Sequence, residues 1–414
     1  MTRYRWLILT LLFLVTTNNY LDRIVISVLI PVIREDLHIS TEQYSYIQAA
    51  FQMAYTIGFL AVGKLIDKYG TRIGYTLSIL WWSVAAALHA FSRSWLQLAF
   101  WRGMLGIGES GNFPAAIKSV AEWFPKKDRA FATGIFNAGT NVASMIGPPL
   151  FVWMAAVYGW RACFTITAST GFVLALVWWI VYRQPEAHGS VSPQELAYIT
   201  GDKDESPAAP RVGWVAALKH KETWGFAMGK FLADPVWWFY LSWLPLYLVD
   251  VRGFDMTKVG WALPVVYLMA DVGSVGGGWL SGFFIRRGWH HATARKTAMA
   301  VCCSLMPVAA LSVLAPNAVL AVALVSLATA GHQGWSCNLF TTVSDVFPKP
   351  AIASVTGIGG AFGGLGGVLF SSLLPGYIVS HFGYTPIFLI MGCFHLAALL
   401  AVHLLLGKME PIKA

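Results

Sequence analysis

The sequence has few charged residues and no cysteine pattern that would bind a metal. Only 12% of its 414 residues are charged, 57% are hydrophobic, and the mean hydropathy is +0.59. Soluble globular domains carry about 25% charged residues, so this composition excludes a soluble globular protein. The five cysteines fall inside apolar runs without metal-ligand spacing, and we expect them to be buried by packing. No nucleophile–base set stands out either, so we expect neither an enzyme, a metal site nor a bound cofactor.

The apolar residues instead occur in runs about as long as a transmembrane helix. We therefore predict an all-α membrane protein with 12 transmembrane helices. The basic, apolar start of the chain imitates a signal peptide, but no small-residue cleavage site follows, so we expect a span there too. The predicted spans are residues 6–33, 43–63, 73–91, 95–120, 129–156, 161–183, 220–250, 257–284, 294–314, 317–341, 352–379 and 384–406.

One long polar segment, residues 184–219, separates the sixth span from the seventh. It contains four prolines and a charged cluster, which is typical of a linker. The two sides look like copies: the tripeptide at 124–126 recurs at 347–349, an offset of 223 residues. We predict a six-helix bundle at 1–183, a cytoplasmic linker at 184–219 and a second bundle at 220–414. This plan resembles that of major facilitator transporters, whose substrate site lies between the halves near the membrane midplane.

The formal charge of +9 would suit nucleic acid, but its distribution argues against that partner. Most lysines and arginines lie in the termini and in alternate loops that share one side of the membrane. By the positive-inside rule that side is the cytoplasm, which predicts both termini there in an inner-membrane protein surrounded by lipid. We expect a monomer. The exceptions are Arg34, Arg93, Arg161, Arg252 and Lys258 on the other side, and Arg23, Arg102, Lys118 and Lys230 inside spans.

Besides Lys118, which lies near the cytoplasmic end of the fourth span, four charged residues of the first half deserve a functional interpretation. Asp22 and Arg23 lie near the middle of the first span, and Arg102 and Glu109 share one face of the fourth, seven residues apart. Charges at this depth are costly, so we interpret them as functional. An arginine suits a carboxylate ligand because its planar fork bonds both oxygens. Asp22 and Glu109 are candidate proton carriers, and the alternative is a static ion-pair network that holds helices together.

Further polar and aromatic residues are candidates for the same cavity. Tyr20 and Tyr55 either donate hydroxyls there or are ordinary packing residues. In the second half, Lys230 and Asp234 are expected to pair at i,i+4. His332 occupies the repeat position of Glu109 and either titrates near neutral pH or only forms a hydrogen bond. The remaining candidates are Trp237, which would stack on a sugar ring, and Asp271, Gln333 and Asn338.

The loop after the second span carries a possible conformational latch. Its glycines allow close approach, and its acidic side chain can reach basic groups and helix ends. The alternative is a solvated charged turn. The residues are Gly63, Asp67, Gly70 and Arg72, and the loop resembles the major facilitator signature between the second and third helices.

Beyond this signature, the chain resembles the anion:cation symporter family of the major facilitators. The segments that carry the likeness are 20–23, 102–109 with 113–115 and 123–125, 231–237, 243–245, 331–333 and 344–347. In detail they are most similar to bacterial hexuronate transporters, with galactonate transporters next. The resemblance implies that Arg102 and Arg23 contact the sugar carboxylate, that Asp22 and Glu109 carry protons, and that Tyr55 hydrogen-bonds the substrate.

We therefore expect a proton symporter that imports a sugar-acid monoanion, with a hexuronate favoured, by alternating access. One rival is a carrier for galactonate or another aldonate, tartrate or an aromatic acid. A rival of another class is a membrane sensor that binds organic acids without transporting them. The sequence assigns no role to Asn18 and Asn19.

Overall fold

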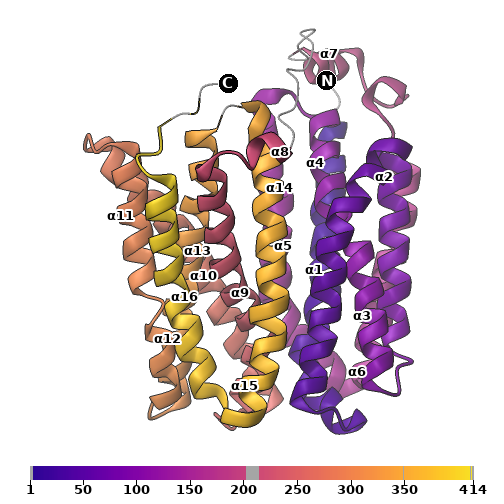
Figure 1. Ribbon diagram of the computed structural model, residues 1–414. Helices are drawn as coiled ribbons and strands as arrows, with labels where there is room; N and C mark the ends of the chain where they lie inside the picture. The colour runs from indigo at the N-terminus through magenta and orange to yellow at the C-terminus, as the bar shows by residue number, and fades with distance from the viewer. Residues whose placement is uncertain (1–2, 202–213, 348, 411, 413–414) are drawn as a thin grey trace. The chain divides into compact units, whose positions relative to one another are not determined.

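The computed structural model of the chain describes residues 3–201, 214–347, 349–410 and 412. Most residues in these ranges are helical and none forms a β-strand, which confirms the predicted all-α class (Figure 1). It divides into two compact units. Unit 1 is Met1–Ile39 with Ala50–Pro207, and unit 2 is Ser40–Ala49 with Ala208–Ala414. The sequence did not indicate that Ser40–Ala49 would group with the second half.

The first six predicted spans are covered by helices of unit 1, except that the start of α2 (Thr41–His89), up to Ala49, belongs to unit 2. The helices are α1 (Tyr4–Leu37), α2, α3 (Trp95–Glu109), α4 (Asn112–Trp123), α5 (Lys126–Tyr158), α6 (Trp160–Val181), the short η1 (Pro185–Ala187) and α7 (Pro193–Thr200). Within unit 1, α1 packs against α5 and α6. The predicted break between the second and third spans lies at Gly70, where φ is 81° and ψ is 160°. A side chain would be strained in that conformation, so glycine is needed there.

The fourth predicted span, 95–120, is wrong as a single helix. It is broken at Ser110 and Gly111 into α3 and α4. Pro114 explains the break, because proline has no N–H to donate to the carbonyl four residues earlier and its ring crowds that carbonyl. The break falls directly after Glu109, which ends α3.

Part of the predicted linker packs on unit 1. Glu195 of α7 is fully buried and accepts hydrogen bonds from the main-chain N–H groups of Tyr4 and Arg5 at 3.1 and 3.2 Å. It also pairs with the Arg5 guanidinium at 3.3 Å. The first N–H groups of a helix lack partners within the helix, so this carboxylate caps α1.

Helices of unit 2 cover the other six predicted spans. They are α8 (Trp214–Ala217), α9 (Lys221–Asp250), α10 (Met256–Arg286), α11 (His291–Ser304), α12 (Val308–Leu311), η2 (Ser312–Leu314), α13 (Ala318–Val346), α14 (Lys349–Gly366), the π-helical η3 (Gly367–Leu373), α15 (Leu374–Phe382) and α16 (Tyr384–Leu406). Two predicted spans, 294–314 and 352–379, are interrupted rather than continuous.

Prolines account for both interruptions. Pro307 precedes α12 in the first. In the second, Pro375 cannot donate to the carbonyl of Ser371 four residues earlier. The indole Nε1 of Trp243 donates to that carbonyl at 2.8 Å instead. A side chain of the neighbouring helix α9 therefore supplies the hydrogen bond that the Ser371 carbonyl lacks within its own helix. A backbone carbonyl buried in a membrane needs such a partner.

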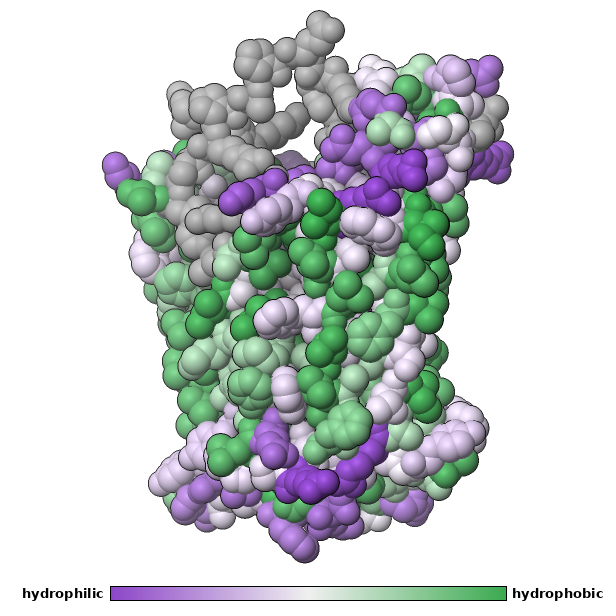
Figure 2. Space-filling view, turned by 90° about the vertical axis from the view of Figure 1, so that its right-hand side faces the viewer, coloured by the Kyte–Doolittle hydropathy of each residue, from purple (hydrophilic) through white to green (hydrophobic). Residues whose placement is uncertain are grey.

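The outer surface is suited to a membrane. Eight helices among the described residues are long and apolar enough to cross one. On the face shown in Figure 2, hydrophobic side chains cover the middle and hydrophilic ones gather toward the two ends. The expected burial of the cysteines is confirmed for Cys163, Cys302 and Cys303, whereas Cys337 is only partly buried and Cys393 is exposed, so the expectation is wrong for these two.

Candidate functional site

The first component of the candidate site is Asp22, on α1 inside unit 1. Its side chain is fully buried. The Asn18 side-chain amide, one turn earlier on α1, donates a hydrogen bond to Asp22 Oδ2 at 2.8 Å. The hydroxyl of Thr170 on α6 donates in turn to Asn18 Oδ1. Asn18 therefore orients Asp22 and links it to α6.

The second component is an ion pair between α1 and α3. Arg23 Nε lies 2.8 Å from Glu109 Oε2, and the two side chains are 14% and 0% exposed. The other carboxylate oxygen of Glu109, Oε1, is buried without a hydrogen-bond partner in the part of the chain that the structure describes. A buried carboxylate is costly even when paired, and an unsatisfied oxygen adds to that cost. The ion pair therefore contributes less to the stability of the fold than an apolar contact of the same size would.

The third component is Arg102 on α3, which is 1% exposed. Its Nη2 donates to the main-chain carbonyl of Arg23 at 2.7 Å, and its Cζ lies 4.4 Å from the centre of the Phe51 ring. The Arg23 Cζ lies 4.6, 4.7 and 5.2 Å from the rings of Tyr55, Tyr20 and Phe51. Aromatic faces attract cations, so these rings hold both guanidiniums without neutralising them.

Two glycines of α3 allow α2 to come this close. A Cβ on Gly106 would lie 2.6 Å from the carbonyl oxygen of Phe51, and one on Gly108 would lie 2.8 Å from the main-chain nitrogen of Trp82. The backbone of α2 therefore packs directly on α3, which places Phe51 beside the guanidiniums. These glycines serve the site by close approach.

Unit 2 contains a buried histidine pair. His332 on α13 and His395 on α16 are 3% and 0% exposed, and His332 Nδ1 lies 3.1 Å from His395 Nε2. The Trp237 indole of α9 stacks on the His332 ring at 5.7 Å between centroids with an interplanar angle of 8°. Trp335 packs edge-on against His395. One imidazole must donate and the other accept, so the tautomers of the two rings are coupled.

The predicted Lys230–Asp234 pair forms on α9, with Nζ 2.7 Å from Oδ2. Lys230 also lies 4.2 Å from the Phe340 ring. The Asn338 amide nitrogen donates to the main-chain carbonyls of Gly277 and Gly334, both at 2.9 Å, which ties α10 to α13. Asp271 on α10 and Gln333 on α13 are both partly exposed, and neither lies in the ion pairs or hydrogen bonds described here.

Of the predicted latch, Gly70 forms the break in α2 and Arg72 contacts α6. Arg72 Nε and Nη2 donate to the carbonyl of Trp179 at 3.0 and 2.7 Å, and Cζ lies 4.3 Å from the Trp179 ring. Gly63 and Asp67 lie outside the residues whose side chains the structure describes. The latch therefore stays a prediction.

Among the residues of these clusters that sequence reasoning missed are Asn18, Phe51 and His395. Asn18 is four residues before Asp22 and Phe51 is four before Tyr55, so helical spacing could have found both. His395 lies 63 residues from His332 on a different helix, and no local pattern indicates it. Within the described ranges, no three His, Cys, Asp or Glu side chains lie together as a metal site would require.

The chain is similar over most of its length to several known proteins. Residues 12–371 match the profile of the Major Facilitator Superfamily. The hexuronate transporter of Escherichia coli K12 is 33% identical over 413 residues, which cover 99% of this chain and 95% of that protein. A galacturonate transporter of Dickeya chrysanthemi is 35% identical over 68% of this chain and 82% of its own.

Other relatives and a solved structure extend the comparison. A probable galactarate/D-glucarate transporter of Escherichia coli K12 is 31% identical and covers 99% of this chain and 96% of its own. A bacterial homologue of the human lysosomal transporter Spinster has a TM-score of 0.73 over 99% of this chain and 97% of its own, at 19% identity. This last likeness concerns the fold alone.

Proposed function

Because the chain belongs to the Major Facilitator Superfamily, we propose that it is a proton-coupled symporter that imports a hexuronate, such as glucuronate or galacturonate, by alternating access. It is a multi-pass protein of the inner membrane with twelve transmembrane helices in two six-helix bundles, and its relatives are transporters rather than enzymes. We further propose that both termini are cytoplasmic, that it acts as a monomer in the lipid, and that protons are the coupling ion.

The observation that carries the proposal is the buried Arg23–Glu109 ion pair beside Arg102. Both guanidiniums lie inside unit 1 and contact the Phe51 ring, and the Arg23 guanidinium also contacts the ring of Tyr55. A monocarboxylate can take the place of Glu109 on Arg23 and make the same charge-assisted contact. The Cζ atoms of Arg102 and Arg23 lie 4.4 and 5.2 Å from the centre of the same Phe51 ring, so a carboxylate beside that ring can approach both guanidiniums.

This substitution gives a physical basis for coupling. If the substrate carboxylate replaces an ionised Glu109, the site holds one more buried negative charge, which is costly. If Glu109 takes up a proton first, the exchange leaves the charge of the site unchanged. Binding of the anion and protonation of Glu109 therefore favour each other. Asp22, held by Asn18, is the second proposed proton carrier.

The choice of a hexuronate rests on the relatives. Those of 33% and 35% identity are described as hexuronate and galacturonate transporters. A second candidate substrate is an aldarate, because a galactarate/D-glucarate transporter is 31% identical over nearly the whole chain. An aldarate has a second carboxylate, which would need a further cationic or hydrogen-bond-donating group beyond those that bind a hexuronate.

The test is uptake by purified protein in liposomes with an imposed pH gradient, acid outside. Labelled glucuronate should accumulate, and unlabelled galacturonate should compete better than galactarate, galactonate, tartrate or benzoate. Stronger competition by galactarate would favour the second candidate. A sensor that binds without transporting would show binding but no counterflow, and that result would contradict the proposal.

A further inference from the structure

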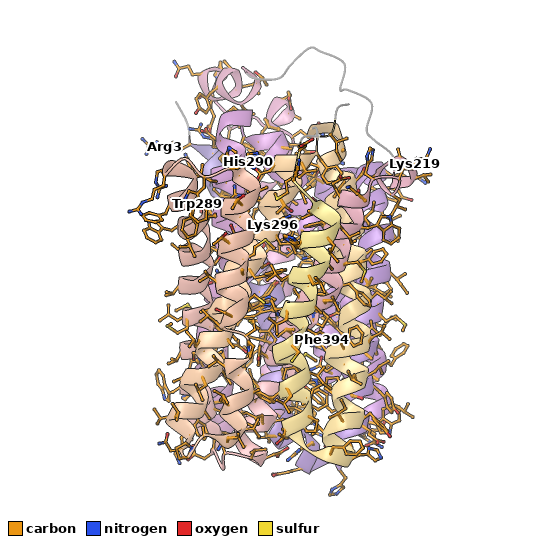
Figure 3. The ribbon with its side chains drawn as sticks, turned by 60° about the vertical axis from the view of Figure 1, so that its left-hand side comes forward. Arg3, Lys219, Trp289, His290, Lys296 and Phe394 are labelled. Atoms are coloured by element: carbon orange, nitrogen blue, oxygen red, sulfur yellow. The ribbon has the colours of Figure 1, made fainter. Side chains whose placement is uncertain are left out.

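Unit 2 has a groove between α11 and α16 with a volume of about 840 Å³. It lies at the end of the unit where α11 begins and α16 ends. Figure 3 shows His290 and Lys296 toward this end of the unit, whereas Phe394 of α16 lies farther from it. The charged and titratable side chains in its lining are His290, Lys296, His403, Lys408 and Glu410.

The groove is amphipathic along its length. Leu400 and Leu396 line it from α16, about one and two turns before His403, and both are well exposed at 59% and 48%. The seven residues from Leu396 to His403 correspond to about 10 Å along the helix. Basic groups therefore lie at the polar edge, and an apolar channel continues from them toward the middle of the unit.

Lys296 is held in place at the polar edge. Its half-buried ammonium donates to the main-chain carbonyl of His403 at 3.3 Å and to that of Gly407. These carbonyls belong to the last turn of α16 and the residue after it, which have no partners within the helix. An ammonium has three N–H donors, so one remains for a ligand.

We propose that this groove binds an acidic phospholipid, with its phosphate between Lys296 and Lys408 and one acyl chain along Leu396 and Leu400. Two lysines against the single carboxylate of Glu410 give the polar edge a net positive charge, which matches an anionic headgroup. The exposed leucines match an acyl chain. A free phosphate would use only the basic edge and leave the leucines in contact with other lipids.

The experiment measures lipid retention by the full-length protein, by native mass spectrometry after purification in detergent with equal phosphatidylglycerol and phosphatidylcholine. We expect one phosphatidylglycerol to be retained in preference to phosphatidylcholine. Lys296→Gln and Lys408→Gln should each weaken that retention about fivefold. Ala300→Phe, which fills the groove without changing its charge, should also displace the lipid, and Lys296→Arg should preserve binding.

The matched control is Lys219→Gln, because Lys219 is basic, lies toward the same end of unit 2 and is outside the groove lining (Figure 3). It should leave retention unchanged. Equal retention of phosphatidylcholine, an equal effect of Lys219→Gln, or displacement by inorganic phosphate alone would each overturn the proposal. Should Lys296→Gln fail to fold, Lys408→Gln and Ala300→Phe provide the same test. No sugar acid is involved, so failure here leaves the proposed transport function untouched.

Discussion

Glu109→Gln is the change that tests the proposed coupling most directly. Glutamine keeps the shape of the side chain and can still accept a hydrogen bond from Arg23 Nε, now 2.8 Å from Oε2. It removes the negative charge that competes with a substrate carboxylate for the guanidinium. The variant should therefore resemble the protonated wild-type carrier at every pH.

The expected magnitude follows from the bond that is weakened. A hydrogen bond to a charged group contributes about 1.5–3 kcal/mol and one between neutral groups about 0.5–1.5 kcal/mol. The difference of about 1–1.5 kcal/mol corresponds to about tenfold tighter binding of glucuronate to the variant near neutral pH. On acidification the wild-type Kd should fall toward that of the variant, whereas the Kd of the variant should stay constant.

Two measurements test this together. Calorimetry in detergent gives the Kd across a pH series, and liposome assays separate accumulation driven by a pH gradient from counterflow. Glu109→Gln should lose accumulation and keep counterflow, because only the proton step is removed. The control is Asp36→Asn in the same unit, which breaks an ion pair with Arg161 of the same 2.8 Å length but with both side chains 45% exposed. It should behave like wild type. Accumulation by Glu109→Gln with a wild-type pH dependence of Kd would refute the assignment.

Three other changes test separate parts of the structure. Arg102→Ala should reduce uptake of every acidic sugar by about 100-fold or more, since two charge-assisted bonds to the substrate are lost, and full uptake would remove Arg102 from the binding site. His395→Phe keeps a ring but leaves His332 Nδ1 without its buried partner, so the protein should lose about 1–3 kcal/mol of stability, measured as a lower Tm; an unchanged Tm would mean that the imidazole pair contributes nothing. Gly108→Ala would place a Cβ 2.8 Å from a main-chain nitrogen of α2 and should cost about 1–3 kcal/mol, whereas Gly134→Ala, which meets nothing within 4 Å, should be neutral or stabilising in the same thermal assay.

Local interactions were predictable because residues three, four or seven apart on a helix share a face. That spacing predicted the Lys230–Asp234 pair, and it could have found Asn18 beside Asp22. The prolines also carried a readable signal. Pro114 and Pro375 remove backbone donors, and both continuous spans predicted through them are interrupted in the structure.

By itself, the sequence determined the helical spans, the polar linker and the presence of two cations and two carboxylates in the first half, since hydropathy and charge are properties of single residues. Only the tertiary structure decided which groups meet. It paired Glu109 with Arg23 although Arg102 is on the same helix, bound Arg102 to the Arg23 main chain, and joined His332 to His395. Such contacts depend on how helices rotate and pack against one another. Close approach at Gly106 and Gly108 sets that packing for α2 and α3, and no periodicity within one helix encodes it.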